Sequence, residues 1–140
     1  MDRHQYLMDM RQEGKLKGLK PSFVFLKNNL GKIYNEGMAD FILSFKNGIL
    51  YFQRMSAIFH TLKPKYDFEL NAKRFKTYKF ERRNYSGCLT LYDKSGYYIE
   101  IWFQVGTKET YSTEVNIDRI IKELESDYNV VKDKGDINEN

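Results

Sequence analysis

Cysteine, histidine, proline and tryptophan are all scarce in this chain of 140 residues. Cys88 is the only cysteine, so no disulfide can form within the chain. It lies in the apolar run 88–92, and we expect a buried thiol that packs as a small hydrophobic side chain. A single thiol is typical of a reducing compartment, so we expect a cytoplasmic protein.

The two histidines do not form a metal-binding motif. His4 and His60 lie 56 residues apart with no cysteine near either, which excludes the common zinc spacings. Nucleophilic catalysis needs a base beside the nucleophile, and nothing in the sequence places Cys88 next to His60. Gly14 and Gly18 lack the preceding strand of a glycine-rich phosphate loop. The sequence therefore predicts a protein that is not an enzyme, with no catalytic residue, no metal site and no cofactor.

Long hydrophobic runs are also missing. No segment approaches the ~18 apolar residues that a membrane span requires. The first five residues lack the apolar core of a signal peptide. We therefore expect a soluble protein without a transmembrane segment.

Aromatic residues, by contrast, are abundant: the chain has 11 tyrosines and 10 phenylalanines. Such side chains favour half-buried pleated surfaces, and the length fits one domain. Asn47-Gly48 between two apolar runs is a strong signal for a type I′ hairpin. Apolar residues with a two-residue period predict strands at 41–45, 49–55, 66–70, 75–80, 88–92 and 97–104. In the last of these, Tyr97, Ile99, Ile101 and Phe103 should face the core.

The two ends of the chain favour helices. Residues 2–13 can form a short helix, and residues 23–33 a second one, with a strand at 23–26 as the alternative. The clearest helix is 116–128, where Ile117, Ile120, Ile121, Leu124 and Tyr128 follow a helical period and Asn116 can cap the start. We expect three regions: an N-terminal helical extension (1–37), a main domain (38–128) and a flexible acidic tail (129–140).

This order of elements resembles the bacterial PH-like (pleckstrin-homology/GRAM-like) domains. The segments that carry the resemblance are 41–52 (FILSFKNGILYF), 89–101 (LTLYDKSGYYIEI) and 115–124 (VNIDRIIKEL). The resemblance implies an α+β fold, in which a bent antiparallel sheet forms a half-open barrel and a C-terminal amphipathic helix caps it. Lipid-binding members cluster Lys and Arg around the first hairpin loop, whereas this turn offers Lys46, so phosphoinositide binding is not implied.

Charge gives the one candidate binding site. The net charge is +4, but residues 116–140 carry −3, which leaves +7 on residues 1–115. The stretch 63–83 interleaves basic and aromatic side chains, a mixture that suits anionic lipid headgroups or nucleic acid. The residues we would assign to an anionic contact surface are Lys73, Arg74, Lys76, Lys79, Arg82 and Arg83. In the alternative interpretation, the aromatics face the core and the lysines line a solvated edge strand.

Function does not follow from such a fold alone, because one fold hosts many functions. Our main hypothesis is a non-enzymatic binding or scaffolding domain for a protein or peptide partner. Such a module should expose an uncovered sheet edge, or an apolar groove beside the C-terminal helix. The alternative is a binder of anionic surfaces through the basic stretch 63–83.

Overall fold

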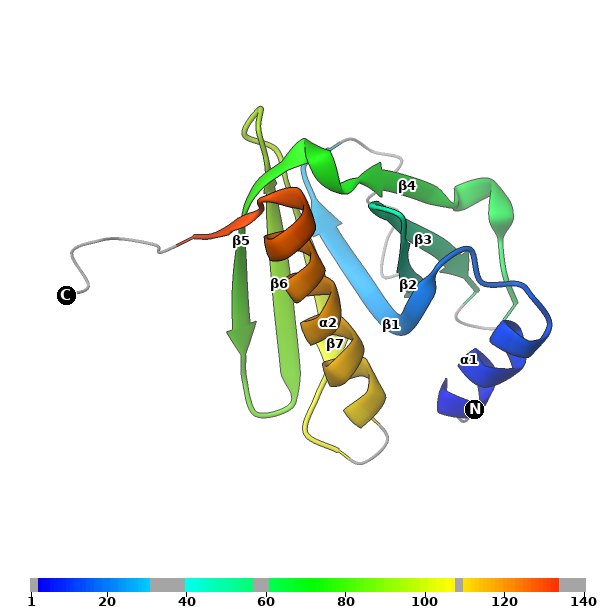
Figure 1. Cartoon of the computed structure of the whole chain (residues 1–140). Coiled ribbons are helices and arrows are strands. Elements are labelled where there is room, and N and C mark those ends of the chain that lie inside the picture. The colour runs from blue at the N-terminus through cyan, green and yellow to red at the C-terminus, as the bar shows by residue number, and fades with distance from the viewer. Residues whose placement is uncertain (1–2, 31–39, 57–60, 108–109, 134–140) are drawn as a thin grey trace.

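The computed structural model describes residues 3–30, 40–56, 61–107 and 110–133. The fold is α+β, as predicted: one large open sheet, a short helix near the N-terminus and a longer helix near the C-terminus (Figure 1). The helices are α1 (Arg3–Gln12) and α2 (Tyr111–Tyr128). The strands are β1 (Leu19–Asn28), β2 (Asp40–Lys46), β3 (Ile49–Met55), β4 (Phe68–Asn71), β5 (Phe75–Arg82), β6 (Ser86–Asp93), β7 (Tyr98–Gln104) and β8 (Val131–Lys132).

The sheet has the strand order β4-β3-β2-β1-β7-β6-β5-β8. All neighbouring strands run antiparallel except β5 and β8, which are parallel. Short turns join β2 to β3, β5 to β6 and β6 to β7, and the tightest of these is Asn47-Gly48 between β2 and β3. Both turn residues have positive φ (52° and 78°), as the type I′ hairpin requires. The predicted hairpin is confirmed.

One expected element is wrong. Residues 19–28 form strand β1, whereas we predicted a second helix from residue 23; the alternative of a strand at 23–26 is correct. β1 lies between β2 and β7, and its backbone pairs with both, so sheet pairing overrides the local helical spacing. The boundary expected at residue 37 lies outside the described residues. Since β1 precedes it and belongs to the same sheet, that sheet is not confined to the region from 38 onwards.

The two helices pack against opposite faces of β1, and near the start of that strand both border one hollow. α2 packs Ile117, Ile120, Ile121 and Leu124 into the main core, all of them buried as the helical period predicted. α1 places Leu7 and Met10 against a smaller cluster with Phe23, Ile42 and Met55 on the other face of the sheet. Because neighbouring residues of a strand point to opposite faces, Phe23 and Val24 in β1 belong to different clusters.

α2 ends at Tyr128 as predicted, but its start and the segment that follows it differ from the prediction. The helix begins at Tyr111, five residues before the expected Asn116 cap, and the Asn116 Nδ2 atom instead donates to the Pro21 carbonyl oxygen (2.9 Å). Asn129 ends the helix in the left-handed conformation (φ 55°). The next residue, Val130, is buried, and β8 then pairs with β5. The tail predicted from residue 129 thus begins with residues that belong to the fold; positions 134–140 lie outside the described residues.

The inward face of β7 is confirmed for three of its four predicted residues. Ile99, Ile101 and Phe103 are buried, whereas Tyr97 is 48% exposed. Tyr97 precedes the first residue of β7 and belongs to the connection from β6, so the alternation of the strand does not apply to it. Cys88 is buried, and its burial raises the pKa of the thiol to about 11.

The β2–β3 turn also positions the end of α2, which gives the first testable prediction. A Cβ atom on Gly48 would lie 2.5 Å from the Tyr128 hydroxyl, whereas a Cβ atom on Gly96, also at positive φ, would meet nothing within 4 Å. We expect Gly48→Ala to lower the free energy of unfolding by about 2–4 kcal/mol, through strained backbone plus overpacking. Gly96→Ala should cost about 1–2 kcal/mol, through the backbone alone. Denaturant unfolding of both variants measures the difference, and equal losses would contradict this role of Gly48.

Candidate peptide-binding groove

Strand β5 has an edge that is only partly covered. The short strand β8 pairs with Thr77 and Tyr78, and within the described residues no strand continues beside Lys79–Arg82 on that side. The Asp133 amide donates to the Tyr78 carbonyl (2.6 Å), so the backbone polar groups of Tyr78 point towards this edge. Since these groups alternate along a strand, those of Phe80 and Arg82 also point outwards. Within the described residues, the second half of β5 therefore forms an uncovered sheet edge.

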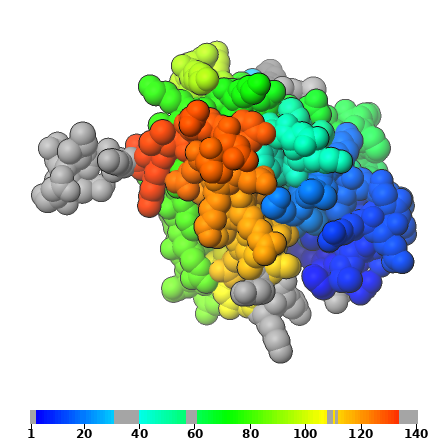
Figure 2. All heavy atoms as spheres, in the orientation of Figure 1, coloured from blue at the N-terminus to red at the C-terminus, as the bar shows by residue number. Residues whose placement is uncertain are grey.

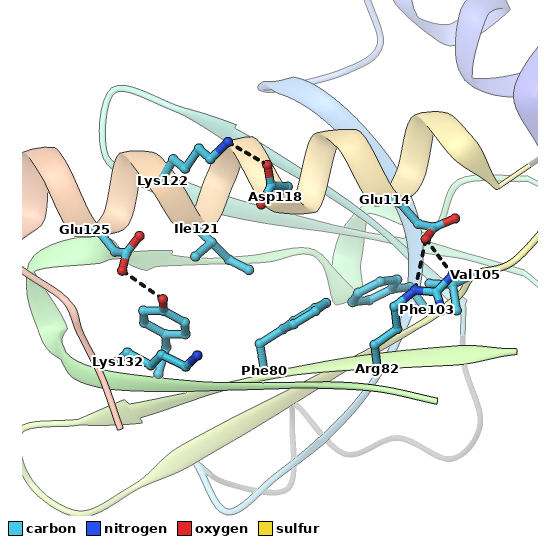
Figure 3. A pocket seen from close by; sticks show the side chains of 11 residues that line it. Phe80, Arg82, Phe103, Val105, Glu114, Asp118, Ile121, Lys122, Glu125 and Lys132 are labelled. Carbon is cyan, nitrogen blue, oxygen red and sulfur yellow. Dashed lines mark hydrogen bonds and ion pairs between the residues drawn. The ribbon is translucent and has the colours of Figure 1, made fainter. Parts of the chain in front are cut away.

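A groove of about 350 Å³ lies between this edge and α2 (Figure 3). Its apolar part is formed by Phe80, Phe103, Val105 and Ile121. The Phe80 ring stacks on the Phe103 ring with the centroids 6.1 Å apart, and Phe80 remains 37% exposed. A large apolar side chain therefore stays accessible at the centre of the groove, where an apolar ligand group can contact it.

Two polar contacts join β5 to α2 across the groove. The Tyr78 hydroxyl donates to Glu125 Oε2 (2.8 Å), and Arg82 Nη2 donates to Glu114 Oε1 (3.1 Å). Between them, Phe80 reaches towards α2 without a polar contact (Figure 3). On α2 itself, Lys122 pairs with Asp118 (3.0 Å). One hydrogen bond and one ion pair therefore link β5 to α2 on the two sides of an apolar centre.

Gly87 makes room for the floor of this groove. It lies opposite Arg82 in β5 and opposite Phe103 in β7. A Cβ atom at this position would come within 2.6 Å of the Phe103 ring. The missing side chain lets Phe103 lie flat over β6, where it supports Phe80.

The six basic residues predicted as an anionic contact surface are spread over β5 and its flanks. Lys79 and Arg83 both pair with Glu81 (3.1 and 3.8 Å) on the face of the sheet that points away from α2. Arg82 lies in the groove and pairs with Glu114.

The remaining members of the predicted surface lie at or near the start of β5. Arg74 donates to Asp93 Oδ2 (2.7 Å), and the pKa of that carboxyl is lowered by hydrogen bonds and by the arginine charge, which outweigh its burial. Lys73 and Lys76 are exposed. Thus four of the six cations contact carboxylates of this chain, and the sequence-based assignment missed the groove residues Phe80, Phe103, Glu114 and Glu125.

Within the described residues, no group of His, Cys, Asp and Glu side chains is arranged to hold a metal ion. Neither α1 nor α2 has both the length and the apolar character that a membrane crossing needs.

Comparisons with known proteins show little similarity. No protein-family model matches the sequence, and no curated protein matches it. Among solved structures, the chain is similar to the hSac2 domain from the human phosphoinositide phosphatase Sac2, with a TM-score of 0.49 and 11% identity. That similarity covers 98% of this chain and 94% of the other. At this level it carries no information on what this chain binds.

Tyr78 gives a pH-dependent prediction. Burial, the hydrogen bond to Glu125 and the charge of that carboxylate raise the pKa of Tyr78 to about 12. The folded chain then holds this proton more tightly than the unfolded chain, whose tyrosine titrates near 10. The resulting stabilisation is complete below pH 10 and is lost as pH rises from 10 towards 12.

Tyr78→Phe should remove this part of the alkaline destabilisation, so the stability of the variant should fall less steeply over that range. At neutral pH the variant should lose about 0.5–1.5 kcal/mol with the hydrogen bond. Denaturant midpoints measured across the range test both effects, with Tyr97→Phe as the exposed control. Parallel alkaline profiles for wild type and Tyr78→Phe would refute the assignment.

Proposed function

We propose that this chain is a non-enzymatic, PH-like binding domain that holds an extended segment of a protein partner in the groove between β5 and α2. Support for the PH-like assignment comes from the strand order, in which seven antiparallel strands precede a helix that packs across the sheet. The open sheet and the isoleucine stripe of α2 agree with the half-open, helix-capped architecture that the resemblance implies.

One observation carries the functional part: the uncovered backbone of β5 lies beside an accessible apolar side chain. A peptide that adds as a strand to β5 gains main-chain hydrogen bonds from Phe80 and Arg82. Its alternate side chains point to one face, so one of them enters the apolar centre beside Phe80. Because β8 occupies the edge at Thr77 and Tyr78, the bound segment covers only the second half of β5.

Binding of anionic lipid or nucleic acid through Lys73, Arg74, Lys76, Lys79, Arg82 and Arg83 is the second candidate. The geometry favours it less, because Glu81, Asp93 and Glu114 pair with four of these side chains. A polyanion would have to compete with those carboxylates. We propose no catalytic role, since the charged side chains of the groove are largely engaged with one another.

A displayed library of random linear peptides tests the proposed function. We expect wild-type protein to select peptides that Phe80→Ala binds at least about tenfold more weakly, as for an aromatic side chain at the centre of an interface. Phe25→Ala is the matched control, because Phe25 is similarly exposed (45%) but lies on β1 outside the groove. The control should bind the same peptides as wild type.

Amide hydrogen exchange of the complex tests the binding mode. Strand addition predicts that the amides of Phe80 and Arg82 become protected, while the other sheet edge, at β4, is unchanged. Selected peptides that bind Phe80→Ala as tightly as wild type, or that protect β4 instead, would overturn the proposal.

A further inference from the structure

A second concave surface lies on the opposite side of α2, between α2 and α1. It has a volume of about 580 Å³, larger than the groove beside β5. On α1 its wall follows positions 4, 7, 8 and 11, and on α2 positions 112, 116 and 119. Both sets have the spacing of one helix face. Its floor is the segment that leads into β1 (Gly18–Pro21), and we call this surface the α1–α2 trough. In Figure 2, α1 and the first turns of α2 lie on the same side of the molecule.

The ionisable side chains that line the trough are all histidine, lysine or arginine. They are His4, Arg11, Lys20 and Arg119, with no aspartate or glutamate in the lining. Lys20 is contacted at 3.5 Å by Glu123, which lies beyond the lining. Arg11 and Arg119 have no ion-pair partner among the described residues. The positive end of the α2 dipole, near Ser112, adds to the same potential.

Most acidic residues of both helices line other surfaces; the exception at the trough is Glu123 of α2, which contacts Lys20. On α1, Asp9 lines a different hollow, together with Glu13 just after the helix. On α2, Glu114, Asp118 and Glu125 line the groove beside β5. Glu123 offsets Lys20, whereas Arg11 and Arg119 line the trough without an ion pair among the described residues, so its lining stays net positive. This contrasts with β5, where carboxylates of the chain itself contact most of the predicted cations.

The trough also exposes apolar surface. Met8 and Leu19 line it and are 52% and 50% exposed, with Leu16 half-buried beside them. A free phosphate or sulfate would gain nothing from these side chains. A ligand that satisfies the whole surface needs an apolar stripe bordered by negative charge, the pattern of an acidic amphipathic helix.

The shape of the trough selects between two acidic partners. A membrane surface is broad and engages basic residues that project from a protein, whereas Arg11 and Arg119 here border a concavity between two helices. A third helix can pack its side-chain ridges against the two walls, as helices do in grooves of this kind. We propose that the α1–α2 trough binds an acidic amphipathic helix of a partner protein, with its apolar stripe on Met8 and Leu19 and its carboxylates at Arg11 and Arg119.

Binding of a designed peptide to the full chain tests this proposal. The probe is a fluorescent helical peptide with leucines along one face and glutamates on both flanks. The control peptide carries lysine in place of every glutamate. Fluorescence polarisation at low salt should show binding of the glutamate peptide only, and that binding should weaken as salt is raised.

The double variant Arg11→Glu/Arg119→Glu should bind the glutamate peptide at least about tenfold more weakly, since two attractive pairs become repulsive. The matched control Lys63→Glu/Lys94→Glu changes the net charge equally at exposed positions outside the trough, and should bind like wild type. Leu19→Ser, at a half-exposed position, tests the apolar contact without a charge change and should also weaken binding. Phe80→Ala should leave this binding intact, which separates it from binding in the groove beside β5.

Three outcomes would overturn the proposal. Equal binding of the glutamate peptide to wild type and to Arg11→Glu/Arg119→Glu is the first. Equal loss in the Lys63→Glu/Lys94→Glu control is the second, because it would show attraction to net charge alone. The third is a wild-type protein that binds vesicles of anionic lipid but not the glutamate peptide, combined with an Arg11→Glu/Arg119→Glu variant that no longer binds the vesicles. Far-UV circular dichroism checks that the double variant is folded; if it is not, Arg119→Gln and Leu19→Ser carry the test.

Discussion

The fold depends on the contact between the isoleucine stripe of α2 and the inner face of the sheet. Ile117, Ile120 and Leu124 are at most 1% exposed, and they join residues from β1 to β7 in a single core. An open sheet with one solvated face cannot bury enough apolar surface by itself, because each strand contributes side chains to both faces. α2 supplies the second layer. The Asn129 cap and the buried Val130 then turn the chain back to the edge of β5.

The elements that local sequence encodes were predictable, whereas those that distant pairing decides were not. Asn47-Gly48 forms the expected turn because its φ angles are a local property of those two residues. The period of α2 is likewise visible in the sequence. β1 was assigned wrongly because its apolar residues fit a helix as well as a strand, and only the vacant position between β2 and β7 decides between them. Residues 29–39 separate β1 from β2, and β7 lies much farther along the chain, so a short window of sequence around β1 contains neither partner.

The same limit applies to the candidate site. A run of basic residues along a strand is divided between two faces, so the neighbours Arg82 and Arg83 point to opposite sides of the sheet. Whether a cation is available then depends on carboxylates brought close by the fold. Glu114 reaches Arg82 from α2, and Asp93 reaches Arg74 from the end of β6. The groove residue Phe80 was visible in the sequence as an aromatic among lysines, but its exposure follows from the place where β8 ends.

Charge pairing within the chain distinguishes its surfaces more sharply than charge content does. Along β5 and the adjacent face of α2, the Arg82–Glu114 ion pair and the Tyr78–Glu125 hydrogen bond link the two elements. Such pairs leave little net field for a charged partner, so recognition there rests on backbone hydrogen bonds and apolar contact. On the other side of α2, Lys20 contacts Glu123, but Arg11 and Arg119 have no ion pair among the described residues, and their field remains available to a partner. Under the two proposals, one helix separates the surface that would bind an extended, largely uncharged segment from the surface that would bind an acidic helix. The helical period fixes the angular positions of the groove face, the trough face and the isoleucine stripe around α2. A rotation of α2 that exchanged the two surfaces would therefore remove the isoleucine stripe from the core.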